Sequence, residues 1–427
     1  MKGFATSLFR RNNFYFDRFK DSLLYMGASL IKLPIAFVTS PIFARNLSLT
    51  DFAAIGYFNT LSTFLMPVIA LMFYNYYMTA YHSRSTEENK TILQSLVSFL
   101  LIIDVLIVSL SFIVLKYYLI SSNSSFNAYP LGLIAFITAM FNMSIGFWGI
   151  KLRFERKSVK FFILQTSNML LSVGMGIVFV VTLKLGAVGR LLPNMIFNIL
   201  LFVLFFKVIV NKFSINWNIV KKAWLFCYPM VISGLLALPI MYLDKMLIER
   251  IHNNSEFGLY NIAFTIAGYF GMVTVAIFQA FQPDIFKLVE SKQKVKLIQM
   301  LILIILIYIV GGGVFYGIAP WAVDYLTAGL YYESIKYLLP NLIIFALQPT
   351  TYFLTYIIIA LKMPKLDLMN QIIIGLLSLV IYSLLIIKFQ YFGALYGKIL
   401  ILIILLSIIS LQIYYRKTRM IKSFISD

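Results

Sequence analysis

Apolar residues run through this chain in long blocks that carry no charge. The clearest blocks are residues 161–183, 257–283, 297–323, 337–361 and 368–387. Each block is long enough for a helix to cross a bilayer, which takes about 20 residues. Proline, glycine and serine inside the blocks argue against strands, and a membrane barrel would show alternating segments of about ten residues. The pattern therefore predicts membrane-spanning helices.

We expect twelve helical spans, because backbone groups cannot be left unpaired in lipid. Their predicted bounds are 22–42, 53–80, 92–115, 130–150, 161–183, 187–208, 223–247, 257–283, 297–320, 336–361, 366–387 and 392–415.

Composition supports a membrane protein with many spans. Of the 427 residues, 61% are hydrophobic and 12% are charged, against about 25% charged in soluble domains. The predicted cytoplasmic segments hold 26 Lys and Arg residues and the opposite side holds 8, which places both termini in the cytoplasm. This rule and anionic lipid headgroups account for the net charge of +20, so nucleic acid is not an expected partner. Cys227 is the single cysteine, so no disulfide or cysteine metal site is expected within one chain.

The chain contains an internal repeat at an offset of 205 residues. At this offset Leu33-Pro34-Ile35 falls on Leu238-Pro239-Ile240, Arg45 on Arg250, Asp51-Phe52 on Glu256-Phe257, and Thr60 on Thr265. The offset equals six predicted helices, so the halves enter the membrane from the same side as a parallel repeat. We expect an all-α integral membrane fold with two six-helix lobes, residues 1–209 and 223–427, joined by a cytoplasmic linker at 210–222. Substrate would bind near the midplane between the repeats, and one lobe would rock against the other.

Three stretches carry a family resemblance: PIFARNLSLTDFA (41–53), YLDKMLIERIHNNSEFGLYNIAF (242–264) and LTAGLYYESIKYLLP (326–340). They resemble motifs of the Wzx-type O-antigen flippases, within the wider group that includes multidrug-and-toxin extruders and the peptidoglycan lipid flippase. One departure is Ala53, where the family usually carries glycine. The resemblance implies an extruder-like fold in a bacterial inner membrane that flips undecaprenyl-pyrophosphate-linked oligosaccharide units, of O-antigen or a similar polysaccharide, to the periplasmic leaflet. It also implies a polysaccharide polymerase and a chain-length regulator as partners.

Lys32 and Asp104 fall inside predicted spans of the first half. Lys32 comes 11 residues after Asp21, which places it about 16 Å deep in a hydrocarbon layer of about 30 Å. Lys32 either lines a cavity and binds the pyrophosphate or pairs with Asp104 or another acid. Asp104 is either structural or couples transport to a proton or sodium gradient. Pro34 and its equivalent Pro239 are the predicted hinges.

Asp244 and Lys245 stand side by side at the end of the seventh predicted span. Asp244 comes 22 residues after Lys222, about 33 Å along a helix, so we expect both side chains near water at the outer rim. There they either form an interfacial ion pair or contact the departing substrate.

Amide and aromatic side chains supply the remaining substrate-binding candidates. Asn75 and Tyr76 belong either to an interfacial aromatic belt or to a sugar site. Gln279 and Gln282 are comparable polar candidates in the second half, and Gln348 is another.

Two other functions compete with a flippase. A multidrug or organic cation antiporter shares the fold but normally wants acidic groups in its cavity, and here the central charge of the first span is Lys32. A membrane polymerase or glycosyltransferase needs a reaction centre outside the bilayer, whereas the longest external connection is about 15 residues, 321–335. We see no catalytic constellation and no glycine-rich nucleotide loop. The sequence predicts a transporter, not an enzyme, with no cofactor and a proton or sodium gradient as the candidate energy source.

Overall fold

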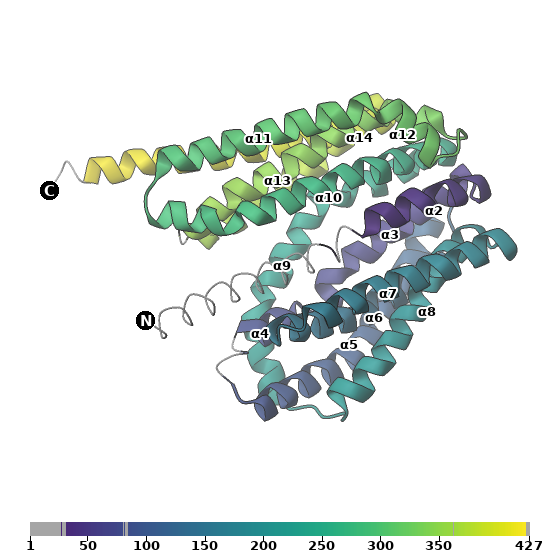
Figure 1. Ribbon diagram of the computed structural model, residues 1–427, viewed down its shortest axis with the longest axis horizontal. Coiled ribbons are helices and arrows are strands. Elements are labelled where there is room, and N and C mark those ends of the chain that lie inside the picture. Colours follow the sequence, from purple (N-terminus) through teal and green to yellow (C-terminus); the bar gives the residue numbers. More distant parts are fainter. Residues whose placement is uncertain (1–26, 28–30, 80, 82–83, 362, 424–427) are drawn as a thin grey trace, which may run out of the picture. The chain divides into compact units, whose positions relative to one another are not determined.

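All the regular secondary structure in the described part of the chain is helical (Figure 1). The structure is a computed structural model and describes residues 27, 31–79, 81, 84–361 and 363–423. Among these residues, ten helices are long and apolar enough to cross a membrane. The all-α integral membrane class predicted from the charge-free blocks is confirmed.

The helices of the first half are α2 (Lys32–Asn46), α3 (Leu49–Ile69), α4 (Phe73–Thr79), α5 (Thr86–Ser121), α6 (Leu131–Phe154), α7 (Ser158–Ile177) and α8 (Gly186–Phe205). Single π-helical turns, Val178–Thr182 and Phe206–Val210, extend α7 and α8. In the second half they are α9 (Trp217–Ile248), α10 (Asn254–Glu290), α11 (Lys294–Gly317), α12 (Ala319–Leu326), α13 (Leu338–Ala360) and α14 (Pro364–Ser423). Two short 3₁₀ segments, Glu249–Ile251 and Tyr332–Tyr337, precede α10 and α13.

One predicted span differs from the observed helices, and one predicted break agrees with them. The predicted span 53–80 is not continuous, because α3 ends at Ile69 and α4 begins at Phe73. Leu71 and Met72 adopt left-handed φ values of 45° and 53°, so the helical bonding pattern stops there. The break expected between the spans 366–387 and 392–415 is present, since Gln390 inside α14 is non-helical.

Contacts divide the described chain into two compact units. The first unit contains the described residues up to Phe43 together with Leu65–Leu115 and Tyr129–Tyr228. The second unit contains Ala44–Phe64, Lys116–Ala128 and the described residues from Pro229 onward. The main break, at Tyr228, lies just beyond the predicted linker 210–222. The non-helical connection is shorter than that linker, because α9 already begins at Trp217.

Each unit has its own apolar core. In the first unit, α4, α5, α6 and α8 contribute side chains to one core, whose fully buried members include Phe73, Leu96, Phe147 and Phe205. In the second unit, α10 packs closely against α13 and α11, and α13 packs against α14. These four helices run alongside one another in Figure 1.

The 205-residue repeat reappears in the hydrogen bonds of α3 and α10. The backbone N–H of Asp51 donates to the Ser48 hydroxyl at 3.1 Å, and at the equivalent positions the N–H of Glu256 donates to the Asn253 side chain at 3.1 Å. Both helices therefore begin with a side-chain cap. Thr60 and Thr265 then bond the carbonyls four residues before them, each at 2.8 Å. The repeat is thus a repeat of local structure as well as of residue type.

Candidate functional site

The end of α9 places two adjacent charges inside the second unit. Asp244 is 0% exposed and Lys245 is 5% exposed. We expected both side chains near water because they lie close to the end of a membrane span. That expectation is wrong: α10 and α14 supply side chains that contact these charges.

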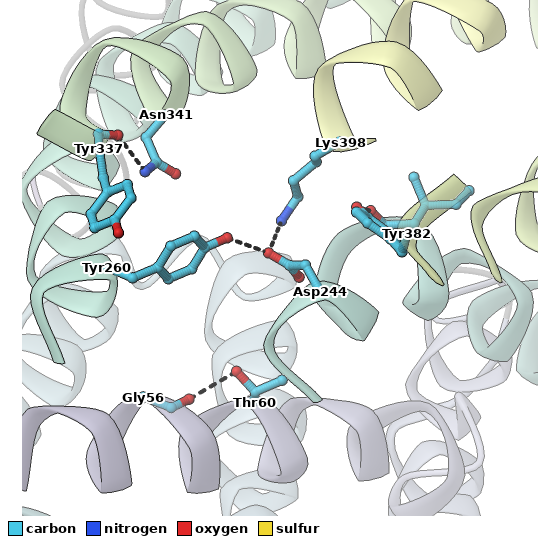
Figure 2. A network of polar contacts seen from close by, with 9 residues as sticks. Gly56, Thr60, Asp244, Tyr260, Tyr337, Asn341, Tyr382 and Lys398 are labelled. Atoms are coloured by element: carbon cyan, nitrogen blue, oxygen red, sulfur yellow. Dashed lines mark hydrogen bonds and ion pairs between the residues drawn. The ribbon is translucent and has the colours of Figure 1, made fainter. Parts of the chain in front are cut away.

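Asp244 is the centre of a polar network in Figure 2. Tyr260 of α10 donates its hydroxyl to Asp244 Oδ2 at 2.6 Å, and Lys398 of α14 places its Nζ 3.5 Å from the same oxygen. Both partners are buried, with Tyr260 at 0% and Lys398 at 2% exposure. The other oxygen, Oδ1, has no hydrogen-bond partner within the described residues. One carboxylate thus ties α9 to α10 and α14.

Lys245 completes the group through an aromatic ring. Its Nζ lies 3.8 Å from the centre of the Phe264 ring, and the Nζ of Lys398 lies 5.6 Å from the same centre. A desolvated ammonium over an aromatic face gains about 2 kcal/mol or more. We call Asp244, Lys245, Tyr260, Phe264 and Lys398 the buried charge cluster. It holds two ammonium groups and one carboxylate, so it carries a surplus of one positive charge when all three groups are charged.

Helical spacing explains how these side chains converge. Tyr260 and Phe264 are four residues apart on α10 and therefore share a face. After the break at Gln390, Tyr391 donates its hydroxyl to the Asn253 carbonyl at 2.8 Å, which fixes α14 against the start of α10. Lys398 lies seven residues, about two turns, after Tyr391 and so points to the same side. Tyr382 adds a second tie, donating to the Ile240 carbonyl of α9 at 2.9 Å.

The sequence identifies Asp244 and Lys245 but not Tyr260, Phe264 or Lys398. Lys398 is one of the eight basic residues assigned to the outer side, because it lies near the start of the last predicted span. Its sequence context, GKILILIILL, did carry a signal. A lysine that opens an apolar run inside a membrane helix needs a partner, and such residues mark functional or structural sites by default.

The structure does not pair Lys32 with Asp104. Lys32 is the first residue of α2 and its side chain is exposed. Asp104 lies in α5 at 0% exposure, and neither of its carboxylate oxygens has a hydrogen-bond partner in the part of the chain that is described. The roles predicted for Lys32 in pyrophosphate binding and for Asp104 in ion coupling stay predictions.

The two predicted hinge prolines sit in different settings. Pro34 lies in the first turn of α2, and Ile31, just before α2, donates its backbone N–H to the Gly27 carbonyl at 2.9 Å. Pro239 lies inside α9, which continues past it to Ile248. A second proline of α9, Pro229, stands at the boundary between the two compact units.

Asn75 and Tyr76 lie on the short helix α4, and both are half-buried. The Tyr76 ring contacts the Phe226 ring at 6.1 Å between centroids, and the Arg84 guanidinium lies 5.0 Å from the Tyr76 ring centre. The structure therefore keeps the Tyr76 ring partly accessible between an aromatic and a cationic neighbour.

Gln279 and Gln282 lie far along α10 from the buried charge cluster. They follow Tyr260 by 19 and 22 residues, about 29 and 33 Å along the helix. Gln279 is exposed and Gln282 is half-buried. The two glutamines thus belong to a different region of the second unit from Asp244 and Lys245.

The described residues contain no group of three or more His, Cys, Asp or Glu side chains placed to hold a metal ion. The buried charge cluster offers one carboxylate, two ammonium groups and a phenol. This set of groups is suited to binding an anion or to passing a proton between partners, and it contains no nucleophile paired with a base.

The fold is that of known membrane transporters. Similar solved structures include the lipid II flippase MurJ in an inward closed conformation, with a TM-score of 0.70, 14% identity, and coverage of 93% of this chain and 87% of that chain. An inward-facing multidrug resistance MATE family transporter of the MOP superfamily has a TM-score of 0.64 and 14% identity, with coverage of 93% of this chain and 96% of that chain. An outward-facing one has a TM-score of 0.54 and 16% identity, with coverage of 94% of this chain and 95% of that chain. No protein-family model and no curated protein matches the sequence. The chain is therefore a multi-pass membrane protein with a transporter fold, and these likenesses do not extend to its substrate.

Proposed function

We propose that this protein flips an undecaprenyl-pyrophosphate-linked oligosaccharide, a repeat unit of O-antigen or a similar surface polysaccharide, from the cytoplasmic to the periplasmic leaflet of a bacterial inner membrane. Transport proceeds by alternating access, with both termini in the cytoplasm. A polysaccharide polymerase and a chain-length regulator act on the product. The fold similarity to a lipid II flippase supports a lipid-linked substrate.

The observation that carries this proposal is the placement of two lysines around one acid in the buried charge cluster. Lys245 and Lys398 are both almost fully buried, and Asp244 is the acid of the cluster. Two ammonium groups held close together in a low-dielectric site are costly, and a further negative charge relieves that cost. A pyrophosphate supplies that charge, and an ammonium is a compact donor for phosphate oxygens. In the first unit, Lys32 is the residue that we propose to bind the pyrophosphate.

A multidrug or organic cation antiporter is the second candidate, and Asp104 favours it. This acid is buried in α5 without a hydrogen-bond partner among the described residues, as a group that receives a cation or a proton would be. The similarity to multidrug resistance transporters fits this candidate equally well as a fold. The buried charge cluster disfavours this candidate, because its two ammonium groups repel an organic cation.

The two candidates are separated by transport in proteoliposomes. Undecaprenyl-pyrophosphoryl N-acetylglucosamine is placed in the vesicles, and its arrival in the outer leaflet is followed with an external galactosyltransferase. Ethidium uptake under a proton gradient is measured in parallel. We expect protein-dependent flipping and no ethidium transport. Ethidium transport without flipping would overturn the flippase proposal in favour of the antiporter.

Variants of Lys245 and Lys32 connect the activity to the charge. Lys245→Gln and Lys32→Ala should slow flipping at unchanged protein levels, whereas Lys245→Arg should keep part of the rate because guanidinium also binds phosphate oxygens. Lys157, an exposed lysine that pairs with Glu155, gives the matched control variant Lys157→Gln, which should flip normally.

A further inference from the structure

One face of α13 carries polar and aromatic side chains at four-residue intervals. Gln348, Tyr352 and Tyr356 follow one another at this spacing and therefore share the face. All three are half-buried. Gln348 donates its side-chain N–H to the Tyr352 hydroxyl at 2.7 Å. The amide carbonyl and the tyrosine hydroxyl retain capacity for further hydrogen bonds.

A matching row on α10 supports this face. Phe278 lies 5.9 Å from Tyr352 and 5.4 Å from Tyr356 between ring centroids, and Phe286 lies 5.8 Å from Tyr356. Gln282 stands between these two phenylalanines at the same four-residue spacing, so it lies on the side of α10 that meets Tyr356. The phenylalanines of α10 thus pack against the tyrosine rings of α13, and each helix adds one amide, Gln282 or Gln348, to the same row.

The position of Gln348 argues against a lipid-facing surface. It lies ten residues after the start of α13 at Leu338 and twelve before its end at Ala360, about 15 Å and 18 Å from the two ends. A polar side chain at this depth is costly in hydrocarbon, so it faces other helices or a polar cavity. An interfacial aromatic belt would lie at the helix ends. Neither lipid contact nor a belt accounts for a central amide bonded to a tyrosine.

Phe345 connects this face to the buried charge cluster. It lies on α13 three residues before Gln348, and its ring contacts the ring of Phe264, a member of the cluster, at 5.4 Å between centroids. The Gln348 end of the face therefore lies nearer to the cluster than the Tyr356 end does.

We propose that Gln348, Tyr352 and Tyr356, with Gln282 beyond them, form a carbohydrate platform that binds the sugars of the substrate, beginning at the Gln348 end. Tyrosine faces pack against the C–H faces of a sugar ring, while the amides and hydroxyls bond its hydroxyl groups. This inference rests on the proposed function, since it assigns the sugar part of the same substrate. The platform binds the sugars, whereas the buried charge cluster binds the pyrophosphate.

The test compares two lipids that differ only in the sugar. Purified protein in nanodiscs is titrated with undecaprenyl pyrophosphate and with undecaprenyl-pyrophosphoryl N-acetylglucosamine, and the ratio of the two Kd values is the readout. In the wild type we expect the sugar to tighten binding about tenfold, the scale of a good aromatic contact with hydrogen bonds. Tyr352→Ala and Gln348→Met should bring the ratio close to one, and Tyr352→Phe should lose only part of it.

The matched control is Tyr325→Ala, which removes an exposed tyrosine of α12 that stacks on Trp321 outside the platform. It should keep the wild-type ratio, and melting temperatures measured without lipid should show that each variant is folded. An unchanged ratio in Tyr352→Ala and Gln348→Met, or a wild-type ratio of one, would overturn the platform while leaving the flippase proposal intact. Failure of the wild type to bind either lipid would instead remove the proposed function, and the platform with it.

Discussion

Asp104 and Asp244 are both fully buried acids in apolar helices, but their surroundings differ. Asp244 accepts a hydrogen bond from Tyr260 and pairs with Lys398, and Lys245 lies beside it. Asp104 has no hydrogen-bond partner within the described residues, and Leu100 and Val108, one turn away on either side, are buried and apolar. The same residue type is therefore compensated in the second unit and uncompensated in the first.

The difference separates two uses of a buried acid. A carboxylate with a phenol and an ammonium around it holds three helices, and removing one partner leaves an uncompensated charge. A carboxylate without partners contributes no such tie and is costly to keep charged. Asp244 is thus expected to matter for folding and for the charge of the site, and Asp104 for transport alone.

The largest effect is expected from Lys398→Met. This change removes the ammonium that pairs with Asp244 and leaves the carboxylate buried beside Lys245. Breaking a buried ion pair from one side costs about 3–5 kcal/mol when the remaining charge has no partner. Because Lys245 stays beside Asp244, the free energy of unfolding in detergent should fall by up to that amount. Thermal unfolding of the purified protein measures the change.

The double variant Asp244→Asn/Lys398→Met tests the same pair from both sides. With the Asp244–Lys398 pair gone, part of the lost stability should return, because replacing a buried pair together is often close to neutral. The cost that remains is that of Lys245, which then has no acid within the cluster. If Lys398→Met alone is as stable as the wild type, the pair does not hold α9 to α14.

The helices could be predicted from the sequence, but the contacts of the buried charge cluster could not. Charge-free blocks of spanning length predict helices from local composition alone, and the break at Gln390 followed from the interruption between two such blocks. The break after Ile69 was missed, because left-handed Leu71 and Met72 carry no residue signal of their own. The contact of Asp244 with Lys398 joins residues 154 positions apart. Depth along one helix indicates distance from the membrane surface, but only packing decides whether a neighbouring helix covers the side chain.

A medium effect is expected from Tyr260→Phe. The phenol donates to a buried carboxylate at 2.6 Å, and a hydrogen bond to a charged group contributes about 1.5–3 kcal/mol. Tyr382→Phe is the matched comparison, because Tyr382 is equally buried and donates to the neutral Ile240 carbonyl at 2.9 Å. Tyr382→Phe should lower the free energy of unfolding by about 0.5–1.5 kcal/mol. Equal losses in the two variants would show that Asp244 draws no special stability from Tyr260.

The smallest effect on folding, with a large effect on transport, is expected from Asp104→Asn. Since neither carboxylate oxygen of Asp104 has a hydrogen-bond partner among the described residues, the amide loses no tie, and the free energy of unfolding should change by less than about 1 kcal/mol. If Asp104 couples flipping to a proton or sodium gradient, the variant should bind undecaprenyl-pyrophosphoryl N-acetylglucosamine normally, yet imposing either gradient should no longer accelerate flipping. Asp284→Asn, at an exposed acid of α10, is the control and should respond to the gradient as the wild type does. A gradient response that survives in Asp104→Asn would make Asp104 a structural residue, and a loss of several kcal/mol in stability would mean that its carboxyl group has a partner after all.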